Sequence, residues 1–311
     1  MLIYAIKRLL AGIPTLLVSF TLVFFIAHAT PGSPWDATSN RPIDPAVKAR
    51  LDEKYHLDQP LYVQYASYLA GAFRGDFGPS FRDRTMNVSD IVERFLPVSL
   101  KLGAAAMVLA VVLGLPLGAL AALSRHSIIN GAIRVLSTIG ISMPTYVITS
   151  ILIVSLGVGL GWVPTFGWHG LFSASSIVPI FSLALAPLGA VIRCFRSSLL
   201  EVMNLDFIKT ARAKGLKPSS IVLNHMGRNA LIPTITVVGA YASSVLVGSF
   251  FVESIAGIPG FGRYLVLAVA ARDYPVIIAT TLIYAVLVIA INILVDLSYF
   301  LLDPRVRAEN T

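Results

Sequence analysis

Residues Asp206–Pro233, DFIKTARAKGLKPSSIVLNHMGRNALIP, form the most polar run in the second half of a very apolar chain. The run has one acid, Asp206, and long hydrophobic segments flank it on both sides. Its basic residues are Lys209, Arg212, Lys214, Lys217 and Arg228. A basic segment between two membrane spans is typical of a cytoplasmic loop, because Lys and Arg collect on that side. Because the chain shows no catalytic site, we predict that this loop forms a surface that binds another protein.

The composition places the chain in a bilayer. Of its 311 residues, 56% are hydrophobic and only 13% are charged, whereas a soluble domain has about 25% charged residues. The net charge of +8 fits basic cytoplasmic loops. We do not expect nucleic-acid binding, because no basic face is interleaved with aromatic residues. The single cysteine, Cys194, excludes an internal disulfide.

Hydropathy predicts an all-α polytopic membrane protein with six transmembrane helices, each long enough to cross a core of about 30 Å. The expected spans are about Leu9–Ala29, Ser99–Leu123, Val135–Leu160, Ile177–Phe195, Leu231–Val252 and Val276–Leu302. Three prolines, Pro116, Pro144 and Pro187, fall inside spans and are placed to kink them. The pairs Gly114/Gly118 and Gly157/Gly161 have the spacing that lets helices approach closely.

Four segments follow from this pattern. Residues 1–29 hold a short amphipathic segment and the first span, and residues 30–97 form an insertion. Residues 98–302 form a core of five spans with a cytoplasmic loop at 196–230, and residues 303–311 form a cytoplasmic tail. The short loops predict that both termini are cytoplasmic, because Lys and Arg gather on their side and the loop 161–176 has neither.

The insertion is expected to hold helices on the periplasmic face. Asp44 is placed to cap a helix with Pro45 at its first position, and a second helix starts at Gln59-Pro60-Leu61. Asn87 or Ser89 is placed to cap a third helix. The insertion either covers the mouth of the helix bundle or docks an external partner.

The stretch 253–275 is also expected outside. Ile258-Pro259-Gly260-Phe261-Gly262 breaks any helix. Arg263–Ala271 is too short to span and reads as a re-entrant or interfacial helix. Such structure is tolerated at membrane depth where it packs on protein or lines a water-filled cavity.

No catalytic chemistry is visible in the sequence. It lacks the nucleotide-binding pattern G-x-x-x-x-G-K-S/T and any His/Cys/carboxylate cluster at metal spacing, so we expect neither an enzyme acting alone nor a bound cofactor or metal. An ion-coupled secondary carrier needs ionisable residues within its spans. Essentially one is present, Asp296, near the cytoplasmic end of the last span and close to Arg305.

One pattern inside the opening stretch resembles the "EAA" loop of ABC-importer permeases in its peptide-transporter form. The pattern is Ala211-Arg212-Ala213-Lys214-Gly215, nine residues, His225, and Arg228-Asn229-Ala230-Leu231-Ile232-Pro233. The resemblance implies coupling to an ATPase through Thr210, Ala211, Arg212, Ala213, Lys214, Gly215, Leu216, Pro218 and His225. We expect two short helices, broken at Gly215 and restarted at Pro218, that turn small residues outward. His225 is expected to be a core residue.

The resemblance covers essentially the whole chain. Further matching stretches are Lys7-Arg8-Leu9, Ile13-Pro14-Thr15, Pro31-Gly32-Ser33-Pro34, Tyr55-His56-Leu57-Asp58-Gln59-Pro60, Gly75-Asp76-Phe77-Gly78-Pro79-Ser80, Arg196-Ser197-Ser198, Ile258-Pro259-Gly260-Phe261-Gly262, Arg272-Asp273-Tyr274-Pro275 and Leu302-Asp303-Pro304-Arg305. Two positions depart from the family: Lys209 replaces the Glu that opens the general motif, as is usual in the peptide branch, and Gly227 replaces a Leu. The Gly227 change is expected to loosen the second helix.

The resemblance implies the type I ABC importer permease fold and a five-part importer of the bacterial inner membrane. The partners are a second homologous permease subunit, two cytoplasmic ATPases that use ATP and Mg, and a periplasmic or lipid-anchored binding protein. The implied activity is import of oligopeptides or dipeptides by alternating access. Nickel, glutathione or another small solute is the alternative within the family, and a secondary carrier or a receptor without transport is the alternative outside it.

Several polar or aromatic residues within the spans are candidates for the translocation path. They are Met143, Thr145, Tyr146, Tyr241, Ser244 and Asn292. The alternative role for these residues is packing and hydrogen bonding between helices.

Overall fold

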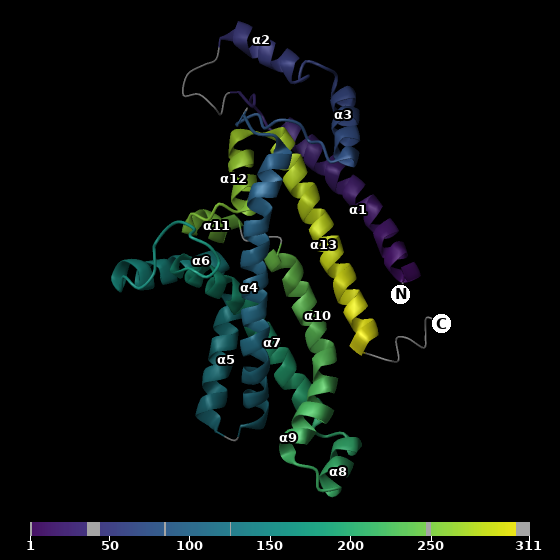
Figure 1. Ribbon diagram of the computed structural model, residues 1–311, viewed down its shortest axis with the longest axis vertical. Coiled ribbons are helices and arrows are strands. Elements are labelled where there is room, and N and C mark those ends of the chain that lie inside the picture. The colour runs from purple at the N-terminus through teal and green to yellow at the C-terminus, as the bar shows by residue number, and fades with distance from the viewer. Residues whose placement is uncertain (1, 36–43, 84, 125, 247–249, 303–311) are drawn as a thin grey trace. The chain divides into compact units, whose positions relative to one another are not determined.

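The computed structural model describes residues 2–35, 44–83, 85–124, 126–246 and 250–302. Within these ranges the regular structure is helical, apart from one isolated bridge between Pro79 and Asn87 (Figure 1). The helices are α1 (Leu2–Ala29), α2 (Pro45–Lys54), α3 (Leu61–Arg74), α4 (Val88–Leu123), α5 (Ser127–Ser142), α6 (Thr145–Leu152), the π-helical η2 (Ile153–Gly159), α7 (Ala174–Val202), α8 (Asp206–Ala213), α9 (Pro218–Ser220), the π-helical η3 (Ile221–Met226), α10 (Gly227–Leu246), α11 (Phe250–Ala256), α12 (Phe261–Ala271) and α13 (Tyr274–Leu302).

The chain forms two compact units. The N-terminal unit comprises residues 6–99 and 259–289, and the core unit comprises residues 1–5, 100–258 and 290–311. The long helices α4 and α13 contribute residues to both units.

Among the described residues, four helices are long and apolar enough to cross a membrane: Arg8–Ala29, Val88–Leu123, Ala174–Val202 and Tyr274–Ser298. Two bent helix pairs, 127–159 and 218–256, raise the number to as many as six. The chain is therefore a multi-pass, all-α membrane protein, as the sequence predicts.

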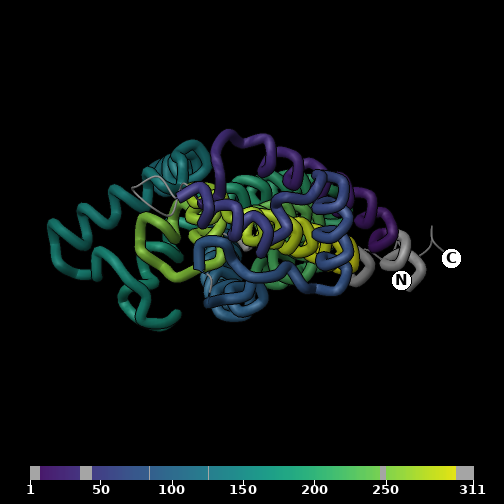
Figure 2. Tube along the Cα trace, turned by 90° about the horizontal axis from the view of Figure 1, so that it is seen from above, coloured from purple at the N-terminus to yellow at the C-terminus, as the bar shows by residue number. Residues whose placement is uncertain are grey.

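The third span bends at Pro144, one of the three prolines that the sequence places to kink a span. Helix α5 ends at Ser142, α6 begins at Thr145, and the two parts of this span are bent by 111°. Met143 is extended, with φ −89° and ψ 132°, because the ring of Pro144 disfavours helical geometry in the preceding residue. Figure 2 shows α6, η2 and the following loop extending to the side of α5 and α7.

The expected third helix of the insertion is not separate from the second span. Helix α4 runs on through Pro97, so the predicted segment boundary at 97/98 falls inside it. Packing against α12 offsets the hydrogen bond that Pro97 removes. The Ser99 hydroxyl accepts a bond from the Phe261 amide at 2.8 Å, and the ring of Phe95 stacks on Tyr264 at 4.1 Å.

Helix α7 is the axis of the core unit, and its neighbours approach it through glycines. A Cβ on Gly140 of α5 would lie 2.4 Å from the Leu185 carbonyl oxygen, and one on Gly189 of α7 would lie 2.4 Å from that of Ser137. Gly114 and Gly118 of α4 likewise face α7, as their spacing predicts. The Gly157/Gly161 pair does not join two helices, since Gly157 packs on loop residues 163–165 and Gly161 has a positive φ of 65°.

In the N-terminal unit the expected starts of α2 and α3 are confirmed. The Asp44 carboxylate accepts a bond from the Ala46 amide at 2.8 Å, and α3 begins directly after Pro60. The buried Asp273 carboxylate clamps the loop after α3, accepting bonds from the Ser80 hydroxyl and from the amides of Phe81 at 3.1 Å and Arg82 at 3.2 Å.

We predict that Gly140→Ala destabilises the protein although alanine has the higher helix propensity. The new Cβ would meet backbone rather than a movable side chain, and overpacking of this kind costs about 1–3 kcal/mol. Gly131→Ala is the matched control, since it lies in the same helix with nothing within 4 Å of its Cβ. Thermal unfolding in detergent should show a lower melting temperature for Gly140→Ala alone. Equal melting temperatures would contradict the close contact.

We predict that Asp273→Ala lowers the melting temperature by several degrees, because three donors lose their acceptor at a cost of about 1–3 kcal/mol each. Asp273→Asn should lose less, since one acceptor oxygen remains. Asp58→Ala, at an exposed position, should leave the melting temperature unchanged, and an equal loss in all three variants would argue against a specific clamp.

Candidate functional site

The segment Asp206–Pro233 folds as a helical hairpin that follows α7 and leads into α10. Helix α8 is amphipathic, with Ile208 and Ala211 buried on one face. Phe207, Lys209 and Thr210 are exposed on the other faces. The helix therefore has a side that fixes it to the protein and a side that remains available.

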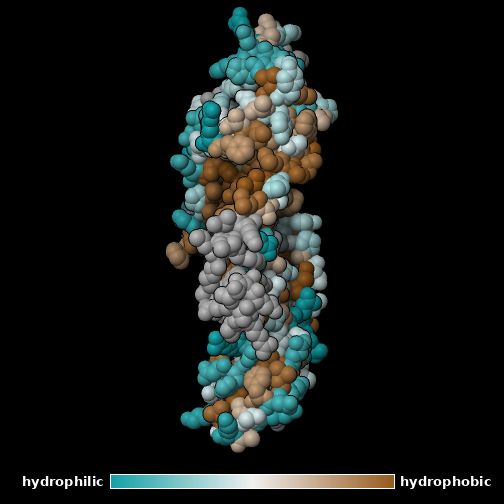
Figure 3. Space-filling view, turned by 90° about the vertical axis from the view of Figure 1, so that its right-hand side faces the viewer, coloured by the Kyte–Doolittle hydropathy of each residue, from teal (hydrophilic) through white to brown (hydrophobic). Residues whose placement is uncertain are grey.

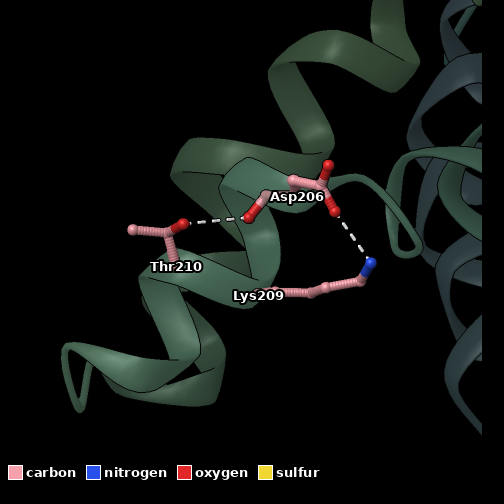
Figure 4. A network of polar contacts seen from close by, with 3 residues as sticks. All are labelled: Asp206, Lys209 and Thr210. Carbon is pink, nitrogen blue, oxygen red and sulfur yellow. Dashed lines mark hydrogen bonds and ion pairs between the residues drawn. The ribbon is translucent and has the colours of Figure 1, made fainter.

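Polar contacts hold the first turn of α8. The Lys209 Nζ lies 2.8 Å from the Asp206 carboxylate, and the Thr210 hydroxyl donates to the Asp206 carbonyl at 3.0 Å (Figure 4). Both pairs are exposed, so they order the turn more than they stabilise the fold. The negative charge of Asp206 at the helix N-terminus is favourable.

The break between the two helices of the hairpin is a Schellman motif. The Gly215 amide donates to the Arg212 carbonyl at 3.0 Å, and the Leu216 amide donates to the Ala211 carbonyl at 3.3 Å. Gly215 has φ +72°, a conformation that glycine adopts without steric cost. The predicted break at Gly215 is thereby confirmed, with its physical cause.

Pro218 restarts the helix at its first position, as expected. From there α9, η3 and α10 run on as one helix up to Val245. Gly227 lies where the π-helical turn of η3 gives way to α10. A Cβ there would approach the Val222 carbonyl oxygen to 3.0 Å.

A cluster of apolar side chains joins the hairpin to the spans. Its buried members are Phe195, Leu199, Val202, Ile208, Ala211, Ile221, Met226 and Ala230. In addition, the Arg196 guanidinium donates to the Ala121 carbonyl at the end of α4, at 3.2 Å. The hairpin is therefore packed as one body with α7 and α10, so a force on it is transmitted to the spans.

The structure corrects one feature of the predicted surface. Ala213 and Gly215 are exposed, as expected, but Ala211 is buried beneath α8. The helical period puts Ala211 on the same face as Ile208, three residues earlier. Among the other predicted coupling residues, Thr210, Arg212, Lys214, Leu216 and Pro218 are exposed. His225 is half-buried, with its backbone carbonyl accepting a bond from Asn229 at 2.7 Å.

The exposed surface of the hairpin mixes positive charge with apolar side chains. Basic residues dominate it, and large apolar residues that the prediction did not include lie among them. These are Leu205, Phe207 and Leu223. Figure 3 shows hydrophilic and hydrophobic residues intermixed at this end of the unit. Such a mixture is typical of a surface that binds another protein. The sequence offers a signal for these residues, because they are large apolar side chains within an otherwise polar loop.

The six candidate path residues lie on three elements of the core unit. Met143, Thr145 and Tyr146 stand at the break between α5 and α6, where the Tyr146 ring lies 5.7 Å from that of Phe251. Tyr241 and Ser244 lie on α10, with the Ser244 hydroxyl donating to the Tyr241 carbonyl at 3.0 Å.

Asn292, on α13, is linked to α10, because its side-chain oxygen accepts a bond from the Ser243 hydroxyl at 3.2 Å. The structure thus joins Asn292 to α10 and Tyr146 to α11, and the assignment of a path stays a prediction. The expected neighbour of Asp296, Arg305, lies outside the described residues. In the part of the chain that the structure describes, no group of three or more His, Cys, Asp or Glu is placed to hold a metal ion.

Comparison with known proteins finds similarity along nearly the whole chain. Residues 114–308 match the family described as binding-protein-dependent transport system inner membrane component, and residues 1–103 match the N-terminal region of such membrane components. The chain is 40% identical over 307 residues to the oligopeptide transport system permease protein OppB of Haemophilus influenzae, covering 99% of this chain and 100% of that protein. It is 43% identical over 304 residues to the dipeptide transport system permease protein DppB of Bacillus subtilis, covering 98% and 97%.

Among solved structures, a chain of the MetNI methionine ABC transporter superposes with a TM-score of 0.56 at 19% identity. The match covers 68% of this chain and 96% of that chain. It shows a shared fold, and so confirms the expected ABC importer permease fold. The chain thus belongs to the family of inner membrane components of binding-protein-dependent transport systems.

Proposed function

We propose that this chain is a permease subunit of an ATP-driven importer of oligopeptides or dipeptides, and that it is coupled to its ATPases through the hairpin 206–233. The observation that carries the proposal is the hairpin itself. Its buried face is packed with α7 and α10, and its exposed face presents basic and apolar side chains. A partner that grips this face can move two spans at once.

Alternating access follows from this coupling. ATP closes the partner ATPases, the hairpin moves with them, and the spans open outward to receive substrate from the binding protein. Hydrolysis and product release reset the cycle. This is a rigid-body switch driven by different contacts in its two states. In this scheme Met143, Thr145, Tyr146, Tyr241, Ser244 and Asn292 lie along the path of the substrate.

The substrate class rests on the relatives, whose names are those of oligopeptide and dipeptide permeases. Nickel, glutathione or another small solute stays the alternative within the family. The remaining partners are a second, homologous permease subunit and two ATPases, which bind ATP and Mg, together with a periplasmic or lipid-anchored binding protein. We assign no ATPase site and no cofactor to this chain.

The proposed topology puts both termini and the loop 196–230 in the cytoplasm and the insertion 30–97 in the periplasm. The distribution of Lys and Arg among the short loops supports it. The organisation into a first span (1–29), an insertion (30–97), a five-span core (98–302) and a tail (303–311) is part of the same proposal.

We predict that Gly215→Asp weakens ATPase binding and that Gly215→Asn does not. Asp and Asn tolerate a left-handed backbone about equally, and nothing lies within 4 Å of a Cβ at this position, so the pair differs in charge alone. A negative charge here should repel an acidic groove on the partner. Co-purification of the ATPases with each variant is the measurement. Equal retention would show that the charge of the hairpin does not orient docking.

We predict that Leu216→Asp lowers both ATPase retention and ATP-dependent peptide uptake, by about tenfold or more, which corresponds to about 1.4 kcal/mol of binding energy. Leu216 is exposed on the hairpin, so the fold should survive. Phe172→Asp is the matched control, because Phe172 is fully exposed on the distant loop 160–173. Uptake is measured in proteoliposomes that hold the complete complex.

Ala211→Glu does not test docking, because Ala211 is buried and the charge would disrupt the core. Uptake that persists in Leu216→Asp without ATPases and collapses with the proton gradient would favour a secondary carrier. ATP-dependent uptake of nickel or glutathione in place of peptides would leave the coupling role intact and overturn the substrate class.

A further inference from the structure

Helix α3 of the insertion packs directly on the first membrane span. The Tyr65 hydroxyl lies 2.9 Å from the Thr21 hydroxyl, and the Tyr65 ring lies 5.2 Å from Phe20 and 5.3 Å from Phe24. Phe20 and Phe24 are buried together with Ile278 of α13. Helix α3 thus packs on both α1 and α13, and Figure 1 shows it beside the C-terminal end of α1.

The contacts with α3 fall on residues of α1 and α13 that belong to the candidate membrane spans. At 1.5 Å per residue, Phe20 lies about 14 Å and Phe24 about 8 Å below the end of α1 at Ala29. Ile278 lies about 6 Å below the start of α13 at Tyr274. A hydrocarbon core is about 30 Å thick, so the spans meet α3 inside the leaflet on the side of the insertion.

The composition and exposure of α3 fit this position. Its 14 residues include one charged residue, Arg74, at the C-terminal end. Tyr62 is 75% exposed and Phe73 is 73% exposed, which leaves aromatic side chains on the surface at both ends of the helix. Helices with this pattern lie in the boundary between headgroups and acyl chains.

Beneath the C-terminal end of α3 lies an apolar groove of about 240 Å³. Its walls come from α1, α3, α13 and the loop after α3, and the described lining side chains are hydrocarbon. They include Ile13, Leu17, Ala72, Phe73, Leu282 and Val286. On α1 the groove lies about 14–24 Å below Ala29, and on α13 about 12–18 Å below Tyr274. Both helices therefore put the groove deeper along the spans than the contacts with Tyr65.

We propose that an acyl chain of a phospholipid occupies this groove and fixes α3 in the leaflet. Water is excluded, because an apolar cavity stays dry. The second permease subunit is the other occupant to be tested, and cross-links from the groove would reveal it. An apolar cavity of about 150 Å³ already holds benzene, so a run of methylene groups fits. The proposal rests on the membrane location of the chain and does not depend on peptide transport.

The test uses a phosphatidylcholine that carries a photoreactive diazirine in mid-chain, with the complete complex in nanodiscs. We expect adducts on the peptides of α1, α3 and α13 that line the groove. Ala72→Phe fills the groove and should reduce this labelling at least fivefold. Ala70→Phe, an exposed position on another face of the same helix, should leave it unchanged. Val286→Phe closes the groove from α13 and serves if Ala72→Phe does not assemble.

The immersion of α3 is tested separately. Phe73→Cys in a Cys194→Ser background should resist a membrane-impermeant maleimide, whereas Ser67→Cys should react at least tenfold faster. Labelling that spreads evenly over α1 and α13 and ignores the filling variants would mean ordinary boundary lipid and overturn the proposal. Cross-links to the second subunit in place of lipid, or equal reaction at positions 73 and 67, would overturn it as well.

Discussion

The burial of Ile208 and Ala211 is the interaction on which the functional surface depends. These two side chains lie on one face of the short, basic helix α8, and that face is buried in the apolar cluster formed with α7 and α10. An isolated helix of 8 residues is not stable in water, so α8 exists because this face is buried. The same burial makes the hairpin and the two spans a single mechanical element. In the proposed coupling role, the hairpin needs this attachment as much as it needs affinity for its partner.

Close contacts between helices in the core unit stabilise α7, which carries the hairpin. The contacts at Gly118 of α4, Gly140 of α5 and Gly189 of α7 itself bring the helices to backbone distance. Between helices in lipid the hydrophobic effect supplies little, so packing at short range has to provide the attraction. We expect α7 to be rigid, because these helix–helix contacts leave no room for a methyl group.

In a membrane protein an exposed side chain can face lipid instead of water, and the N-terminal unit offers a case. Tyr62 and Phe73 are exposed aromatic residues at the two ends of α3, and in the proposed position of α3 they face lipid. In the same unit, Asp273 is buried but well satisfied by Ser80 and two backbone amides. The loops of this unit are therefore secured by a fully bonded carboxylate.

Local chemistry in the sequence determined which segments are long and apolar enough to span a membrane, the helix starts at Asp44 and Pro60, and the hairpin broken at Gly215 and restarted at Pro218. These features depend on nearest neighbours: apolar run length, the missing amide of proline and the left-handed backbone of glycine. Tertiary structure decided the rest. It set which face of α8 is buried, and so removed Ala211 from the surface. It also carried α4 through Pro97 and brought α3 onto α1. Each of these outcomes depends on packing between residues distant in the chain, which local propensity does not encode.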